Sequence, residues 1–238
     1  MSRIGLIGGT ALREWDEFQI EEKIQENTPW GTPSSPLFKG RLEEEEIILL
    51  MRHGPDHTIP PHRINHRANI YALQKEVDEI IGICSSGALS GEIEIPSISI
   101  PEDYVNFWDT TTFYNEKIKH VTPGLSQVIR NQLIEAAEGS EYDNINSDGV
   151  YVQTKGPRLE TKAEVKILQR FGDLVGMTMA SEATLSKESA LEYAALVTVD
   201  NYAHGVKGEE VEYEEIVDTA RDNWDKVKEI LIRFLKRR

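Results

Sequence analysis

Short apolar runs alternate along the chain with longer stretches in which apolar residues recur every three or four positions. The runs, of four to six residues, are typical of buried strands, and the longer periodicity is typical of helices that bury one face. This alternation predicts an α/β fold, with the strands in one sheet and the helices packed on it. The expected strands are Ile4–Ile7, Ile47–Met51, Glu79–Cys84, Gly149–Gln153, Leu174–Met177 and Ala194–Val199.

Helices are expected at 65–75, 123–138, 162–170 and 182–191, and over the last part of the sequence. Thr122 followed by Pro123 is typical of an N-cap with proline at the first helical position. Four isoleucines between positions 93 and 100 flank Pro96, which favours an irregular or edge strand there. The last helix has the clearest pattern, an apolar stripe of Ile216, Ala220, Trp224, Val227, Leu231 and Phe234.

The length of 238 residues is enough for one domain, residues 1–238, with a sizeable core. The 41 acidic and 26 basic residues give a formal net charge of -15, which disfavours nucleic acid and membrane as partners. An anionic substrate would therefore need a local cluster of positive charge. Cys84 is the single cysteine, so no intrachain disulfide can form. With no signal-peptide pattern and no long apolar run, a cytoplasmic location is expected.

The segment GLIGGT, from Gly5 to Thr10, directly follows the first expected strand. The backbone N–H groups at Gly8 and Gly9 could bind an anion, and the Thr10 hydroxyl could add a donor. The segment matches neither GxGxxG nor GxxxxGK[ST], so no nucleotide fingerprint is present. A tight turn without a ligand explains the same residues.

Arg52 and His53 follow the second expected strand, in the segment MRHG. A guanidinium can bind two phosphate oxygens at once, and a neighbouring histidine adds a donor. Three further histidines and two arginines follow between positions 57 and 67, and a solvated basic surface is the alternative interpretation. A zinc site is another, since His53 and His57 have metal-like spacing, but the nearby residues form no recognised ligand set.

The segment Cys84–Ala88, CSSGA, ends the third expected strand. Small side chains and hydroxyl groups there could line a pocket, because open α/β sheets bind ligands at the carboxyl ends of their strands. A serine nucleophile is the rival hypothesis, but the sequence has no GxSxG elbow.

Together these segments resemble the trimeric class of purine nucleoside phosphorylases, specifically the branch with the 5'-methylthioadenosine and 5'-methylthioinosine phosphorylases. The resemblance covers most of residues 3–217. It implies a single α/β domain with a mixed, barrel-like sheet surrounded by helices, and an active site partly at a subunit interface. The motifs that carry it are IGLIGGT, TPWGTPSSP, MRHGPDHTIPPHRINHRANIYAL, SSGAL, YVQTKGPRLETKAE, LVGMTMASEATLSKE and VTVDNYAHG.

The resemblance also implies the reaction: inorganic phosphate cleaves a purine nucleoside into the free base and a ribose 1-phosphate or 5-methylthioribose 1-phosphate. Phosphate is then a co-substrate, and no cofactor or metal is implied. Met177 is implied to lie against the ribose. The implied phosphate ligands are Thr10, Arg52, His53, Ser85 and Thr178, and the implied catalytic residues are Asn201, Glu160 and His53.

Two positions bear on which purine is accepted. Glu160, which follows Leu159 in GPRLET, stands at the family's base-facing position, where a carboxylate accepts the N1–H of a 6-oxopurine but opposes the bare N1 of adenine. Asn201 aligns with the position that is Asn in 6-oxopurine enzymes, and its amide can donate to O6 and accept from N7–H. Both residues favour hypoxanthine or guanine. Asp200 lies one residue earlier and would favour adenine if it were the residue that contacts the base.

Residues near the start of the last helix select the 5' group in this family. Val217 is apolar and favours a methylthio group, whereas Tyr213 suits either substituent. His120 resembles a histidine that a neighbouring subunit contributes, and the branch implies a homotrimer or a homohexamer. The expected substrates are 5'-methylthioinosine, inosine or guanosine, with 5'-methylthioadenosine as the alternative.

Two other classes of function remain as alternatives. One is a non-catalytic nucleoside-binding protein, against which the retention of Arg52, His53 and Thr178 argues. The other is a nucleoside hydrolase, but the sequence lacks the Asp-rich calcium-binding motif typical of those enzymes.

Overall fold

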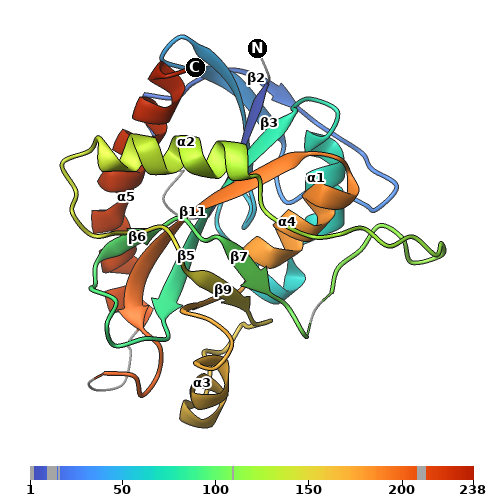
Figure 1. The fold of residues 1–238 in the computed structure, drawn as a ribbon. Helices are drawn as coiled ribbons and strands as arrows, with labels where there is room; N and C mark the ends of the chain where they lie inside the picture. The colour runs from blue at the N-terminus through green and yellow to red at the C-terminus, as the bar shows by residue number, and fades with distance from the viewer. Residues whose placement is uncertain (1–2, 10–14, 16, 109, 208–212) are drawn as a thin grey trace.

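The computed structural model describes residues 3–9, 15, 17–108, 110–207 and 213–238, without the side chains of 213–218, 220 and 221. A mixed sheet runs through the middle of the molecule (Figure 1). Its central strands are parallel and lie in the order β4, β1, β5, β11. They are β1 (Ile4–Gly8), β4 (Glu45–Met51), β5 (Glu79–Ala88) and β11 (Glu192–Tyr202).

Shorter strands extend the sheet from both sides of this parallel centre. Two antiparallel strands continue it beyond β4, and β5 and β11 each carry further strands. The path from β2 to β7 does not pair its two ends within the described residues, so the expected barrel-like sheet is in fact open. The strands are β2 (Gln19–Ile24), β3 (Leu37–Leu42), β6 (Ser97–Ser99), β7 (Asp103–Val105), β8 (Ile145–Asn146), β9 (Val150–Gln153) and β10 (Leu174–Gly176).

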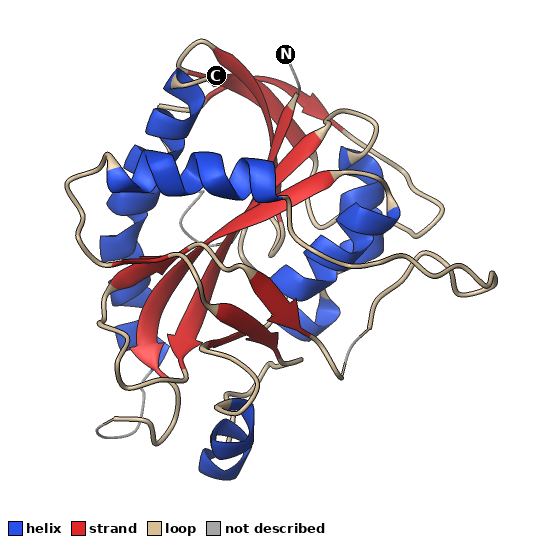
Figure 2. Cartoon of the chain, viewed as in Figure 1, coloured by secondary structure: helices blue, strands red, loops and turns tan. Residues whose placement is uncertain are grey.

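Helices cover both faces of the sheet (Figure 2). Side chains on successive strand residues point to opposite faces. Ile4 and Leu6 of β1 therefore belong to the core beneath α2 and α5, whereas Ile7 belongs to the core beneath α1 and α4. The helices are α1 (His66–Leu73), α2 (Gln127–Glu138), α3 (Lys162–Leu168), α4 (Met179–Glu188) and α5 (Tyr213–Lys236), with a short 3-10 turn at Pro61–Arg63.

The expected α/β fold, with a mixed sheet between helices, is confirmed. Two local expectations are wrong. Helix α2 begins at Gln127, because Gly124 has a φ of 149° that no helix tolerates, and Ser126 caps it by accepting the Ile129 N–H. The strand expected around Pro96 is irregular, since only Ser97–Ser99 form β6, but it is not an edge strand, because β6 pairs with both β11 and β8. Among the described helices, none is long and apolar enough to cross a membrane.

Candidate active site

The segments expected to bind an anion lie at one edge of the sheet. Parallel strands bring their carboxyl ends to the same edge, and β1, β4 and β5 run parallel. The Arg52 N–H donates to the Gly8 carbonyl at 3.0 Å, which joins the end of β4 to the end of β1. The structure thus brings together Gly9, the Arg52–His53 pair and the Ile83–Cys84 part of β5, as the sequence predicts.

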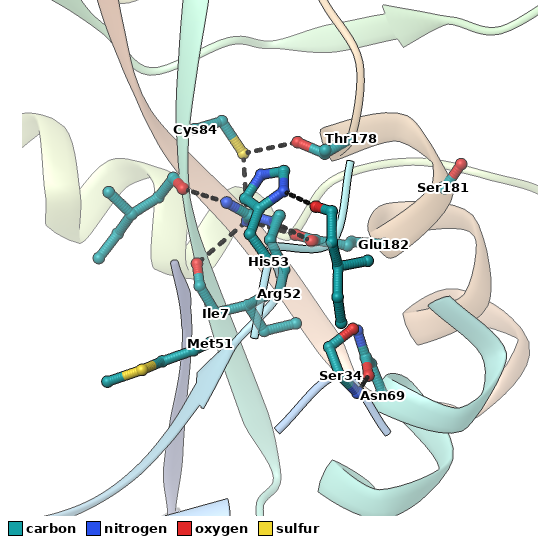
Figure 3. Close-up of polar contacts among 12 residues, drawn as sticks. Ile7, Ser34, Met51, Arg52, His53, Asn69, Cys84, Thr178, Ser181 and Glu182 are labelled. Carbon is teal, nitrogen blue, oxygen red and sulfur yellow. Dashed lines mark hydrogen bonds and ion pairs between the residues drawn. The ribbon is translucent and has the colours of Figure 1, made fainter. Parts of the chain in front are cut away.

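Arg52 is almost fully buried, and a carboxylate that the sequence did not single out holds it (Figure 3). Its Nε donates to Glu182 Oε1 at 2.6 Å and its Nη2 to Oε2 at 3.0 Å. Nη2 also donates to the Ile7 carbonyl and Nη1 to the Ile83 carbonyl. An arginine has five N–H groups, so one hydrogen, on Nη1, remains without a partner among the described residues. The expected two-oxygen grip on phosphate is therefore not available in this arrangement, because Glu182 already occupies that side of the guanidinium.

The remaining Nη1 hydrogen has a defined neighbourhood. A Cβ atom at Gly9 would lie 3.7 Å from Arg52 Nη1 and 3.9 Å from His53 Nε2. Both nitrogens therefore border the small space that Gly9 leaves open by having no side chain. Because no Cβ separates these nitrogens from the Gly9 backbone, a ligand can approach both of them. Thr10 lies outside the described residues.

The tautomer of His53 follows from its backbone partner. Its Nδ1 lies 2.8 Å from the Ile59 carbonyl oxygen, and because a carbonyl only accepts, Nδ1 carries the hydrogen. Burial, together with the Arg52 charge, lowers the pKa of His53 from 6.5 to about 4. At neutral pH its Nε2 therefore faces the Gly9 space as an acceptor, which suits the hydroxyl group of a hydrogen phosphate ion.

Thr178 and Cys84 complete this buried group. The Thr178 hydroxyl lies 3.7 Å from Cys84 Sγ, which is also 3.5 Å from Arg52 Nη2. Burial raises the pKa of the Cys84 thiol to about 11, so the thiol stays neutral. Thr178 precedes α4 without capping it, and its hydroxyl is therefore not committed to the helix end.

A second group of polar residues lies where β11 runs beside the end of β5. Ser85 is exposed, and its hydroxyl donates to Asp200 Oδ2 at 2.5 Å. While that bond is made, the Ser85 hydroxyl cannot also donate to a phosphate. Asn201 is half-buried beside Gly87, and its Nδ2 donates to the Tyr202 carbonyl, which leaves its Oδ1 and one N–H for a ligand.

Glu160 and Met177 belong to a third group, next to β10. Glu160 is buried, and its Oε1 accepts from the Thr154 hydroxyl at 2.6 Å. Thr154 also donates its N–H to the Gly176 carbonyl, directly before Met177. A Cβ atom on Gly156 would overlap the Met177 sulfur, so the loop before Glu160 lies against Met177.

The remaining predicted residues are less enclosed. Leu159 is 42% exposed, and His120 lies in an exposed segment, residues 115–120, beyond the part of the loop that contacts Glu188. Tyr213 and Val217 lie in the first turns of α5, and their side chains are outside the described part of the structure.

Glu182 is the main residue of the site that sequence reasoning missed. It is 1% exposed and lies on α4 among buried residues that include Met179 and Ala183. Its Oε2 also accepts from the Tyr193 hydroxyl at 2.9 Å. A carboxylate on the apolar face of a helix was the available signal, because a buried charge needs a partner.

A comparison with known protein families shows which family the chain belongs to. The sequence profile of the phosphorylase superfamily matches residues 3–236. This chain belongs to the phosphorylase superfamily. The resemblance inferred from the motifs is thereby confirmed.

Individual relatives are similar over most of their length. The chain is 44% identical over 221 residues to a probable 6-oxopurine nucleoside phosphorylase of Archaeoglobus fulgidus, a match that covers 92% of this chain and 90% of the relative. It is 36% identical to a probable S-methyl-5'-thioinosine phosphorylase of Thermodesulfovibrio yellowstonii, covering 99% and 91%. A methylthioadenosine phosphorylase from Schistosoma mansoni, solved in complex with adenine, has the same fold, with a TM-score of 0.88, 24% identity, and 99% and 91% coverage.

Proposed function

We propose that this chain is a purine nucleoside phosphorylase that cleaves 6-oxopurine nucleosides, such as 5'-methylthioinosine, inosine and guanosine, with inorganic phosphate. The observation that carries the proposal is the space beside Gly9, bordered by Arg52 Nη1 and His53 Nε2. An oxygen-rich ion with both an acceptor and a donor suits these two nitrogens, and hydrogen phosphate has both. The relatives named for 6-oxopurine and thioinosine phosphorylases support the same substrate class.

On the phosphate side, Arg52 supplies a permanent positive charge and one N–H. His53 accepts the phosphate hydroxyl at Nε2, and Thr178, which contacts Cys84 Sγ as Arg52 does, would add its own hydroxyl. Thr10, in the segment after β1, and Ser85, on β5, are also proposed phosphate ligands. A phosphate held in this way is oriented for attack, which supplies much of the rate gain of a two-substrate reaction.

On the base side, acceptors and donors match a 6-oxopurine. A Glu160 carboxylate accepts the N1–H, while the Asn201 amide donates to O6 and accepts N7–H. Adenine would place its N1 lone pair against the Glu160 carboxylate, which leaves two acceptors facing each other. Leu159 and Met177 would supply apolar contacts to base and sugar.

The reaction exchanges one bond at the sugar. The C1'–N9 bond breaks and its electron pair leaves with the purine, while a phosphate oxygen forms a new bond to C1'. Positive charge develops on the sugar between them, and the bound phosphate dianion stabilises it. The hydrogen bond from the Asn201 amide to O6 strengthens as the departing purine gains electrons, while Glu160 orients the base through its N1–H. The product is a ribose 1-phosphate, or its 5-methylthio counterpart.

The proposal includes an oligomer and a location. A homotrimer, or a homohexamer of two trimers, would place His120 near the 5' end of a neighbour's nucleoside, beside Tyr213 and Val217. Residues 115–120 suit such a contact, because all are exposed and Ile118 is 95% exposed. A cytoplasmic location fits a chain whose single cysteine is free and buried.

A substrate panel tests the function. Inosine, guanosine, adenosine, 5'-methylthioinosine and 5'-methylthioadenosine are each incubated with the enzyme, with and without phosphate, and free base is measured by chromatography. We expect release of hypoxanthine or guanine that requires phosphate and yields a sugar 1-phosphate. Release without phosphate would indicate a hydrolase, preference for 5'-methylthioadenosine would indicate the adenine-type enzyme, and no release would indicate a binding protein.

A further inference from the structure

Asp200 occupies an irregular position in β11. In the pairing of β11 with β5, Val199 lies opposite Ser86 and Asn201 lies opposite Gly87, so Asp200 has no partner residue on β5. Such a bulge changes the direction in which the neighbouring side chains point. Asp200 and Asn201 therefore differ in surroundings although they are adjacent: Asp200 is 3% exposed, whereas Asn201 is half-buried.

The Asp200 carboxylate accepts three hydrogen bonds from three parts of the fold. Ser85 on β5 donates to Oδ2 at 2.5 Å, and Thr198 on β11 donates to the same oxygen at 2.8 Å. Asn223 on α5 donates to Oδ1 at 2.8 Å and is fully buried. A residue that contacts a purine must present free atoms to it, but Asp200 is 3% exposed and the protein uses three of the roughly four acceptor sites of its carboxylate.

We propose that Asp200 is a positioning residue and does not contact the base. It stabilises the bulge that leaves Asn201 facing the nucleoside. Its carboxylate also links β5 to helix α5, because it accepts hydrogen bonds from both Ser85 and Asn223. This inference rests on the proposed phosphorylase function, and it names which of the two adjacent residues sets the purine preference.

The hydrogen bond from Ser85 to Asp200 determines whether the Ser85 hydroxyl can donate to a ligand or only accept from it. Because its hydrogen is donated to Asp200, the exposed Ser85 oxygen presents only lone pairs to a ligand. Ser85 therefore accepts from a ligand hydroxyl, on the sugar or on hydrogen phosphate, and does not donate to a phosphate oxygen.

The chain offers a reciprocal exchange as a test. In Asp200→Asn the new amide oxygen can still accept from Ser85 and Thr198, but its NH2 group faces the NH2 group of Asn223. The contact re-forms only if the Asn223 amide turns to present its Oδ1, which is buried without a hydrogen-bond partner among the described residues. The double variant D200N/N223D restores a donor–acceptor pair at that contact while keeping the shape of both side chains. The exchange therefore distinguishes the effect of losing the hydrogen bond between positions 200 and 223 from the effect of losing the aspartate at position 200.

The experiment measures kcat/KM for inosine and adenosine in wild type, D200N, D200N/N223D and Asn223→Ala, with unfolding midpoints recorded for each. We expect D200N and N223A to lower kcat/KM for both nucleosides by a similar factor, about 10- to 100-fold, as small misplacements in an active site do. The ratio of inosine to adenosine stays at the wild-type value, and the double variant recovers most of the activity.

Three results would overturn the inference. One is a change in either direction, in D200N, of the ratio of kcat/KM for inosine to that for adenosine, which would show that Asp200 contacts the base. Another is unchanged kcat/KM in folded D200N and N223A, which would make the network purely structural. The third is a folded double variant no more active than D200N. If D200N does not fold, N223A and the double variant decide. A wild-type enzyme without phosphate-dependent activity would instead reject the proposed function.

Discussion

Glu182 holds the Arg52 guanidinium along one side, with Nε 2.6 Å from Oε1 and Nη2 3.0 Å from Oε2, and both residues are at most 2% exposed. The two residues are 130 positions apart in the sequence. The pair places a carboxylate beside the Arg52 charge and fixes the orientation of the guanidinium. What remains for a ligand is a single Nη1 hydrogen in a known direction, beside Gly9 and His53.

Glu182→Gln should strongly destabilise the fold. The substitution leaves the buried Arg52 charge without a counter-ion, which costs about 3–5 kcal/mol in comparable cases. The free energy of unfolding by urea measures it. Glu229→Gln is the matched control, since Glu229 also pairs with an arginine, Arg233, at 2.7 Å, but at the partly exposed surface, where about 0–1 kcal/mol is expected. Equal losses in the two variants would contradict a dominant role for the buried pair.

His53 should make stability depend on pH. Its pKa in the folded chain, about 4, lies below the ordinary 6.5, so the unfolded chain binds the proton first as the pH falls. The stability that comes from keeping His53 neutral is complete above pH 6.5 and is lost as the pH falls toward 4. His53→Gln removes this loss. The difference in unfolding free energy between wild type and this variant should therefore be about 2 kcal/mol smaller at about pH 5 than at about pH 7.

The control for that measurement is His62→Gln, at an exposed histidine of the same loop region. The difference measured for this variant gives the effect of replacing a histidine at an exposed position. A pH-independent difference for His53→Gln would mean that the folded chain keeps the ordinary histidine pKa at this position.

The sequence predicted the parts of the fold that are marked by apolar pattern. The strands β1 and β4 were found because each is a short continuous apolar run, and both runs are buried. Helix α5 was found because Trp224, Val227, Leu231 and Phe234, which are all buried, recur every three or four residues. Strand β2 was missed because it lies at the edge of the sheet and its residues are mostly exposed and charged, QIEEKI. A strand without a buried face leaves no periodic signal.

In the candidate site, too, some residues could be predicted from sequence motifs and others could not. Motifs located Arg52, His53 and Thr178, and the structure brings them together through Cys84 and Gly9. The local pattern of α4 could have indicated a buried carboxylate at Glu182, but not its pairing with Arg52, because the two residues are 130 positions apart and tertiary packing brings them together. The bulge at Asp200 depends on the pairing of β11 with β5, which a single strand's sequence does not specify.

Thr154→Val should lower activity through Glu160. The Thr154 hydroxyl donates to Glu160 Oε1 at 2.6 Å, and valine has nearly the same shape without the hydroxyl. Losing one hydrogen bond to a charged group costs about 1.5–3 kcal/mol, or roughly 10- to 100-fold. We expect kcat/KM for inosine to fall by this factor, with a smaller effect on adenosine. Thr154→Ser keeps the hydroxyl and should retain activity, and a serine variant as impaired as the valine variant would exclude the hydrogen bond as the cause.

Asn201→Asp should shift the purine preference toward 6-aminopurines. An aspartate there accepts from the amino group of adenine, whereas it faces O6 of hypoxanthine with like polarity. The mismatch leaves a buried polar contact unmade, worth about 1–3 kcal/mol, so the ratio of kcat/KM for inosine to that for adenosine should fall by roughly 5- to 150-fold. Asn144→Asp, the same substitution in an exposed loop, is the control and should leave the ratio unchanged.

Because Asn201 and Asp200 are adjacent, the two single variants decide between them. A ratio that changes in Asn201→Asp and not in Asp200→Asn assigns the base contact to Asn201. A ratio unchanged in Asn201→Asp would remove Asn201 from the base pocket.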